Sequence, residues 1–214
     1  MSEGFHFYTQ YHLVEVLGLH TRNPGELLEG IKAVPASSIY YHTHRFLQQH
    51  HYLSPEPPND FAFWLMDIMH LNSLGEEFLS IDTVHYCNLE DLREKFQDIL
   101  EEYLSNGGSN TDCLPGFEFH FLACKTFVLP MPYVAHNLTE FAEILKKVSI
   151  RALYFHMFEA RMRLGVPDND FSQWLKSLGE KSLANKISRL DPYNMTLESL
   201  RKKIIRMVED RVQS

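Results

Sequence analysis

Hydrophobic and polar positions alternate at two places in the chain, and aromatic residues occupy the apolar positions of both. Phe5 and Phe7 form the first pattern, and Phe117, Phe119 and Phe121 form the second. A period of two over aromatic residues is typical of a strand with one buried face. The pattern therefore predicts a short, half-buried strand near each of these places.

The following segments repeat apolar residues at the spacing of amphipathic helices. Asn23 and Asn137 each stand three residues before a Glu, so we expect both to cap a helix that begins at the next residue. Second helices are expected over residues 37–53 and 151–164. In the first case Pro35 separates the two helices, because proline interrupts the helical hydrogen bonds.

The heptapeptides NDFAFWL and NDFSQWL begin at residues 59 and 169 and contain the only two tryptophans of the chain. We expect each to start a third helix, with Asp60 and Asp170 as N-caps and the tryptophans as core anchors. Final helices are expected after Asn88 and Thr196, which are also capping residue types.

The two heptapeptides belong to a longer internal similarity. Residues 5–42 align without a gap to residues 119–156, with 11 identities in 38 positions, and similar runs continue downstream in the same order. We therefore expect a tandem duplication, with repeats at 1–104 and 117–214 and a linker at 105–116. The predicted fold is mainly α with a short β element per half, packed as one globular unit with pseudo-twofold symmetry.

Composition narrows the class of protein. The chain has 214 residues, of which 44% are hydrophobic, so it can bury a substantial core. It contains no run of roughly 18–20 apolar residues that would predict a membrane span. Its first residues do not have the pattern of a secretory signal. Three cysteines without CxxC spacing argue against a disulfide framework or a cysteine zinc site, and we expect a cytoplasmic protein.

Charge is distributed unevenly along the chain. The net charge of −8 weighs against general nucleic-acid binding. Residues 1–116 hold 5 Lys and Arg against 17 Asp and Glu, whereas residues 117–214 hold 15 against 11. This asymmetry predicts either a basic interaction surface in the second half or two halves that attract one another. We favour mutual attraction, because the halves are related in sequence.

His42 and His156 occupy the same place in the two repeats, each within an aromatic cluster. As catalytic candidates they would be acid–base groups or ligands, with Tyr40 and Tyr154 as nearby proton donors. The alternative is a buried histidine that is bonded to a polar partner, such as the Asp or Asn of NDF. The structural interpretation is favoured, because a feature kept in both repeats is more simply explained by a shared folding need than by two active sites.

Residues that differ between the repeats are therefore the better candidates for chemistry. His44 and His51 are present only in the first repeat, and they are candidate ligand-binding residues. In the second repeat, Arg161 is a candidate clamp for a carboxylate or phosphate. The spacing of Glu159 and Arg163 instead predicts a solvated helix pair.

A metal site is only weakly indicated. The chain has 12 histidines, but His44 and His51 would lie about 10 Å apart along a helix and could not share one ion without other ligands. Asp67 and His70 are the weak candidates for such a site. No P-loop, dinucleotide-binding, zinc-protease or hydrolase motif is present, and no particular cofactor is indicated.

Three runs of the sequence are specific enough to suggest a relationship. They are VPASSIYYHTHRFLQQHHYLSPEPPNDFAFW, FVLPMPYVAHNLTEF and RALYFHMFEARMRLGVPDNDFSQWL. The chain resembles, over nearly its whole length, a prokaryotic family of about this size whose function is unknown. The resemblance implies a bacterial or archaeal protein, and it implies no activity, cofactor or catalytic residue.

Two functional hypotheses remain. In the first, the protein is a non-enzymatic pseudo-dimer with a groove that binds a ligand, a protein partner or a second copy of the chain. In the second, it is an enzyme with one site at the repeat interface, which uses His42 or His156 with residues such as Tyr40 and Arg161, with or without a metal. The duplication and the lack of a known catalytic motif favour the first hypothesis.

Overall fold

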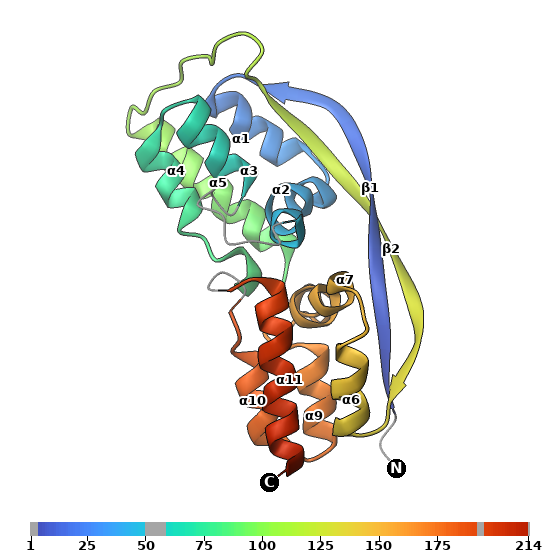
Figure 1. Ribbon diagram of the computed structural model, residues 1–214. Coiled ribbons are helices and arrows are strands. Elements are labelled where there is room, and N and C mark those ends of the chain that lie inside the picture. The colour runs from blue at the N-terminus through green and yellow to red at the C-terminus, as the bar shows by residue number, and fades with distance from the viewer. Residues whose placement is uncertain (1–3, 50–58, 192–194, 214) are drawn as a thin grey trace. The chain divides into compact units, whose positions relative to one another are not determined.

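The computed structural model describes residues 4–49, 59–191 and 195–213, and it is mainly helical (Figure 1). Two long strands, β1 (Phe5–Thr21) and β2 (Phe119–Ala135), run in opposite directions and form a two-stranded sheet. Among the described residues, no helix has the length and apolar character needed to cross a membrane. The helical elements are α1 (Pro24–Ala33), α2 (Ala36–Gln49), α3 (Asp60–Phe63), the π-helix η1 (Trp64–Ile68), α4 (Asn72–Leu79), the 3-10 helix η2 (Thr83–His85), α5 (Leu89–Ser105), α6 (Leu138–Leu145), α7 (Ile150–Tyr154), the π-helix η3 (Phe155–Glu159), α8 (Ala160–Leu164), α9 (Asp170–Ser177), α10 (Lys181–Ser188) and α11 (Leu197–Gln213).

The chain divides into two compact units, and both strands contribute residues to each of them. Of the described residues, unit 1 holds 4–11, 126–191 and 195–213, and unit 2 holds 12–49 and 59–125. The first residues of β1 therefore belong to the unit that contains α6–α11, and the first residues of β2 belong to the unit that contains α1–α5. The compact units and the repeats predicted from the sequence divide the chain differently.

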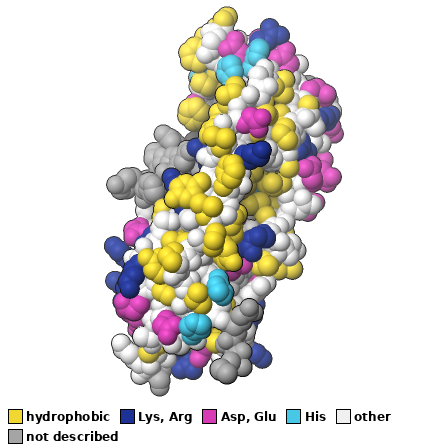
Figure 2. Space-filling view, turned by 90° about the vertical axis from the view of Figure 1, so that its right-hand side faces the viewer, with side chains coloured by type: hydrophobic (Ala, Val, Ile, Leu, Met, Phe, Trp, Pro, Cys, Tyr) yellow, Lys and Arg dark blue, Asp and Glu magenta, His cyan; other side chains and the backbone are white. Residues whose placement is uncertain are grey.

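The strands are much longer than the short elements predicted from the aromatic alternation. Each strand has 17 residues, but the alternation of buried and exposed positions is clear only at the ends. Hydrophobic residues in the middle remain exposed, including Leu13 and Val16 on β1 and Phe127 and Val128 on β2. Figure 2 shows hydrophobic side chains gathered on the face where these strands run. Because these exposed residues follow no period of two, the sequence pattern did not reveal the full strands.

Aromatic side chains from the start of β1 fill the core of unit 1. Phe5 packs on Phe141 and Phe171, with ring centroids 5.8 and 5.3 Å apart. Phe7 lies beside the same two rings and is 1% exposed. Trp174 contacts both Phe5 and Phe141. The helices of unit 1 therefore bury their apolar faces against a segment located more than 130 residues earlier in the chain.

Aromatic side chains from the start of β2 fill the core of unit 2 in the same way. Phe119 packs on Phe61 and Trp64, with ring centroids 5.2 and 5.9 Å apart. Phe121 is fully buried, and its ring also contacts Phe61. Phe96 of α5 completes the cluster against Phe61 at 5.3 Å. Both predicted tryptophan anchors, at 4% and 8% exposure, are thus confirmed as core residues.

Helix starts agree with the sequence prediction in most cases. The Asn23, Asn137 and Asn88 side chains accept hydrogen bonds from the first turns of α1, α6 and α5, which confirms them as N-caps. The prediction for the heptapeptides was wrong by one residue, because the N-caps of α3 and α9 are Asn59 and Asn169. The carboxylates of the following aspartates are therefore directed to other partners.

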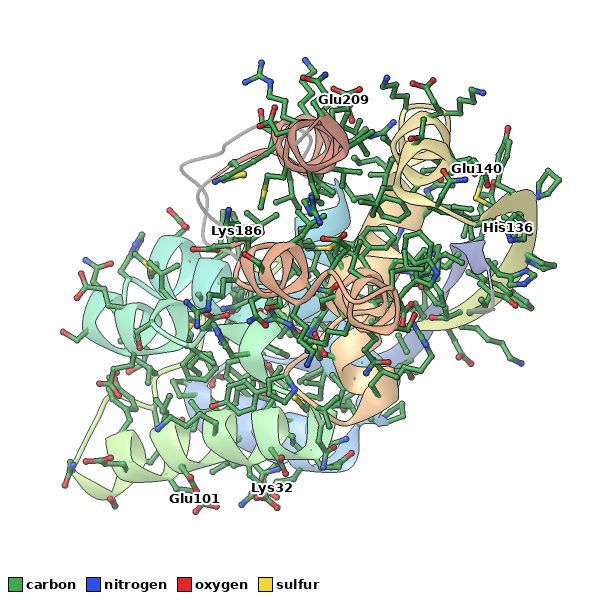
Figure 3. The ribbon with its side chains drawn as sticks, turned by 90° about the horizontal axis from the view of Figure 1, so that it is seen from below. Lys32, Glu101, His136, Glu140, Lys186 and Glu209 are labelled. Carbon is green, nitrogen blue, oxygen red and sulfur yellow. The ribbon has the colours of Figure 1, made fainter. Side chains whose placement is uncertain are left out.

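Ion pairs join the first helix of each unit to its last long helix. Lys32 of α1 lies 2.9 Å from Glu101 of α5, and the two side chains meet in Figure 3. Lys146 of α6 lies 2.9 Å from Glu209 of α11. All four side chains are substantially exposed, so solvent screens both ion pairs. The helix contacts themselves depend mainly on the buried apolar faces.

Of the two second helices predicted, one is regular where it is described and the other contains an irregular turn. α2 is described as far as Gln49, in agreement with the helix expected over 37–53. The segment expected as one helix over 151–164 is helical, but π-helical turns at Phe155–Glu159 separate α7 from α8. A π-helical turn carries one additional residue, so the side chains after it point in different directions from those of a regular helix. This change affects where Glu159, Arg161 and Arg163 point.

Candidate ligand-binding groove

His156 lies at the wall of a groove in unit 1, and both of its ring nitrogens have partners. Its Nδ1 lies 2.7 Å from Oδ2 of Asp170, and the backbone N–H of Tyr8 donates to its Nε2 over 2.8 Å. A backbone N–H is always a donor, so Nε2 must be the acceptor and Nδ1 must carry the proton. The ring is 2% exposed. His156 therefore links α9 to β1 as a neutral imidazole.

His42 makes the corresponding contacts in unit 2. Its Nδ1 lies 2.7 Å from Oδ2 of Asp60, and the backbone N–H of Leu122 donates to its Nε2 over 3.0 Å. The side-chain hydroxyl of Ser38 donates to the carbonyl of Leu122, so α2 satisfies both backbone groups of this strand residue. The expectation of a buried histidine bonded to a polar residue of NDF is confirmed for His42 and His156, and the partner is the aspartate in both cases.

The electrostatics of the unit 1 pair favour the neutral ring. Burial is the main influence on His156 and lowers its pKa, although Asp170 opposes this effect. Burial raises the pKa of Asp170, but hydrogen bonds from His156 and Arg163 outweigh burial and leave that pKa below its ordinary value. A proton added at Nε2 would face the N–H of Tyr8, donor against donor. Acid–base catalysis by this ring would therefore break its link to the strand.

The two tyrosines proposed as proton donors lie in the core. Tyr154 is fully buried and packs against Phe158, with ring centroids 5.3 Å apart. Tyr40 is 7% exposed, stacks on His44 at 5.5 Å, and directs its hydroxyl to Nε2 of His12 over 3.5 Å. Burial and stacking give both rings a packing role.

Of the residues proposed to bind a ligand, the two that the structure describes, His44 and Arg161, are both buried. His44 is 2% exposed, its Nδ1 lies 2.8 Å from the Thr43 hydroxyl, and burial lowers its pKa to about 4. Arg161 is 7% exposed and donates to the backbone carbonyl of Ser188 over 3.1 Å. It acts as a link between α8 and α10 in this position. His51 lies outside the described residues.

Asp67 and His70, the weak metal candidates, line a small cavity of about 170 Å³ in unit 2. Its other walls are apolar and include Leu114 and Phe117. His70 has a positive φ of 56°. In the part of the chain that the structure describes, no three His, Cys, Asp or Glu residues are arranged to hold a metal ion.

The groove beside His156 has a volume of about 740 Å³ and is lined by residues of unit 1. Four of its lining residues are aromatic, namely Phe5, Tyr8, Phe155 and Trp174. Besides His156, its polar lining residues are His6, Arg163, Asp170, Gln173 and Ser177. A concave, mainly apolar surface with a few polar groups is the usual form of a small-molecule site.

Arg163 has a different environment from the one predicted. Its guanidinium donates to Oδ2 of Asp170 over 2.6 Å and lies over the ring of Phe155, 4.7 Å from the ring centre. Glu159, its expected partner, is buried and accepts a hydrogen bond from the side chain of Gln10. The prediction of a solvated Glu159–Arg163 pair was therefore wrong, because the π-helical turn and the strand direct Glu159 inward.

Sequence reasoning missed Arg163, Gln173 and Ser177 as candidate site residues. A usable signal was present in the alignment of the repeats. Arg163 aligns with Gln49, and the heptapeptide alignment, continued without a gap, places Ser177 opposite Asp67. These positions differ between the two aligned segments and lie near the His–Asp pair that the segments share, so a search for such differences would have indicated this groove.

Comparisons with known proteins place the chain among proteins of unknown function. The model of a family of unknown function, DUF5752, matches residues 2–209. No curated protein matches the chain. A solved structure, described as the structure of OrfY from Thermoproteus tenax, is similar with a TM-score of 0.84 and 27% sequence identity. The similarity covers 99% of this chain and 97% of that one. The resemblance to a family of unknown function is thus confirmed.

Proposed function

Because the chain belongs to the DUF5752 family, whose function is unknown, we propose a function from its site: a non-enzymatic binding protein built from two repeats. Its ligand occupies the groove of unit 1 beside His156. The observation that carries the proposal is the state of His156. Its two ring nitrogens are committed to Asp170 and to the backbone of Tyr8, so the ring forms a wall of the groove without a nitrogen for proton transfer.

Matching contacts in the two units support the duplicated, pseudo-dimeric part of the proposal. Each histidine bonds an aspartate at 2.7 Å and accepts a strand N–H from the other repeat. The first helix of each unit begins with an Asn cap. In both helices, a Glu three residues after the cap accepts a hydrogen bond from the backbone N–H of the residue before the cap. His136 and Glu140, which form this bond at α6, are labelled in Figure 3. Such detailed correspondence is the expected result of a duplication in which the two strands are exchanged.

The dimensions and walls of the groove support a binding role. A volume of about 740 Å³ is within the range of small-molecule sites. Trp174 and Phe155 are 8% and 5% exposed, so the aromatic walls are anchored in the core. A ligand would therefore meet a preformed surface and would lose little free energy to ordering of the protein.

A fragment screen on the full chain tests this proposal. Ligand-observed NMR with a library of small aromatic and aliphatic fragments is expected to give hits with the wild type. Ser177→Trp fills the groove and should abolish these hits while preserving the melting temperature. Asp67→Trp, at the aligned position of unit 2, is the matched control and should retain the hits.

Two results would contradict the proposed function. The first is binding that Ser177→Trp leaves unchanged, because the ligand would then lie elsewhere. The second is chemical turnover of a fragment that is lost in His156→Gln or His42→Gln, because the histidines would then take part in a reaction.

A further inference from the structure

The guanidinium of Arg163 is held on two sides at the edge of the groove. One N–H group donates to Asp170 over 2.6 Å, and the ring of Phe155 supports the flat face at 4.7 Å. The side chain is nevertheless 44% exposed. A guanidinium has five N–H donors in a fixed plane, so the contact with Asp170 leaves further donors on a side chain that lines the groove.

Three other polar residues of the groove, Gln173, Ser177 and Asp170, are either neutral or already paired with a donor. Gln173 and Ser177 are exposed and uncharged. The side-chain amide of Gln173 can donate hydrogen bonds, whereas the Ser177 hydroxyl already donates to the backbone carbonyl of Trp174 over 2.7 Å. Asp170 is the only carboxylate among the lining residues, and it already accepts from both His156 and Arg163. The described residues of unit 1 hold 14 Lys and Arg against 10 Asp and Glu.

From this arrangement we infer that the groove of unit 1 binds a small organic anion with a flat apolar body. The inference rests on the proposed function and names the ligand class. The carboxylate or phosphate of the ligand pairs with Arg163, and the amide of Gln173, which lines the same groove, adds a hydrogen bond. The apolar body lies against Tyr8 and Trp174, which supply stacking surfaces.

Two positions of the groove have different side chains in the aligned sequence of the other repeat. The residue aligned with Arg163 is Gln49, and the residue aligned with Ser177 is Asp67. In the sequence, a neutral amide stands at the position of the cation, and a carboxylate stands at the position of the hydroxyl. Unit 2 has a cation of its own, because Arg45 lies over Tyr41, 4.7 Å from the ring centre, as Arg163 lies over Phe155. We therefore assign anion binding to the groove of unit 1, where Ser177 brings no negative charge.

The test uses three probes on the full chain: phenyl phosphate, benzyl alcohol and inorganic phosphate. Dissociation constants are measured by calorimetry or NMR titration at low and high salt. We expect the wild type to bind phenyl phosphate at least tenfold more tightly than either other probe, because only this probe has both the anion and the apolar body. Higher salt should weaken this binding, since screening reduces an ion-pair contact at an exposed guanidinium.

Two variants separate the anion contact from general effects. Arg163→Gln introduces the residue of the other repeat and should raise the dissociation constant of phenyl phosphate at least tenfold. Ser177→Asp copies the other repeat at a second position and should have a similar effect without removing the Arg163–Asp170 contact. Arg151→Gln is the control, because Arg151 also lies over an aromatic ring of unit 1, 5.0 Å from Tyr11, but does not line the groove.

The outcomes distinguish this inference from the proposed function. Equal binding of benzyl alcohol and phenyl phosphate, with Ser177→Trp still blocking both, would overturn the claim that the ligand is an anion. The groove would remain the binding site. Equal binding of inorganic phosphate and phenyl phosphate would overturn the claim that the ligand needs an apolar body. Loss of phenyl phosphate binding in Arg151→Gln but not in Arg163→Gln would place the anion elsewhere, and no binding of any small molecule would contradict both proposals.

Discussion

Single buried residues connect the strands to the helices of both units. The backbone N–H groups of Tyr8 and Leu122 would otherwise need another partner at the edge of a two-stranded sheet. The Nε2 atoms of His156 and His42 accept them, and the aspartates at the starts of α9 and α3 fix the tautomer. A residue type common in active sites therefore acts here as a neutral hydrogen-bond bridge.

Buried neutral histidines should make the protein sensitive to acid. The pKa of His44 is lowered from 6.5 to about 4 by burial, and the pKa of His156 is also lowered. Between pH 6.5 and 4 the unfolded chain binds a proton at His44 that the folded chain does not. The free energy of unfolding should therefore fall as the pH drops through this window, by on the order of 3 kcal/mol from His44 alone.

Urea denaturation at pH 7.5, 6, 5 and 4 checks this expectation. His44→Leu should flatten the slope between pH 6.5 and 4, whatever its effect on stability at pH 7.5. His6→Leu, at an exposed position, gives the background slope. An identical slope in His44→Leu and in the wild type would show that His44 does not cause the loss.

At the scale of elements, close packing of a helix on a strand sets one backbone requirement. A Cβ added at Gly30 of α1 would overlap the ring of Phe121 on β2 and would also contact Thr21. The Phe121 ring is fully buried and has no space to move into. Glycine is therefore needed at this interior position of α1, despite its poor helix propensity, because Phe121 of β2 lies so near.

Gly30→Ala should consequently destabilise the protein, although alanine improves helix propensity by about 1 kcal/mol. We expect a net loss of roughly 1–3 kcal/mol in the free energy of unfolding, measured by urea denaturation. Glu29→Ala on the exposed side of the same helix should change it by less than about 0.5 kcal/mol. A second change, Phe121→Leu, should restore part of the loss in Gly30→Ala. A stabilised Gly30→Ala protein would refute the tight contact.

At the scale of the whole molecule, the compact units require segments that are distant in the chain. Unit 1 includes residues 4–11, and its core contains Phe5 and Phe7. The hydrogen bond between Tyr8 and His156 spans 148 positions of the sequence. Long-range contacts of this kind make folding depend on both halves of the chain.

The halves should therefore assemble only together. Residues 117–214 produced alone should lack a cooperative unfolding transition, because the strand that fills their core is missing. Co-expressed with tagged residues 1–116, they should co-purify in a 1:1 ratio and recover near-UV circular dichroism. Phe5→Asp with Phe7→Asp in the first fragment should prevent this recovery. Cooperative folding of residues 117–214 alone would contradict the exchanged strands.

The sequence by itself determined the features that depend on neighbouring residues. The caps at Asn23 and Asn137, the break at Pro35 and a polar partner within NDF for each histidine all follow from local hydrogen-bonding chemistry. Only the tertiary structure decided which strand enters which unit and that Arg163, rather than Arg161, reaches the groove. The physical reason is that these features depend on long-range packing and on a π-helical turn, and neither leaves a regular period in the sequence.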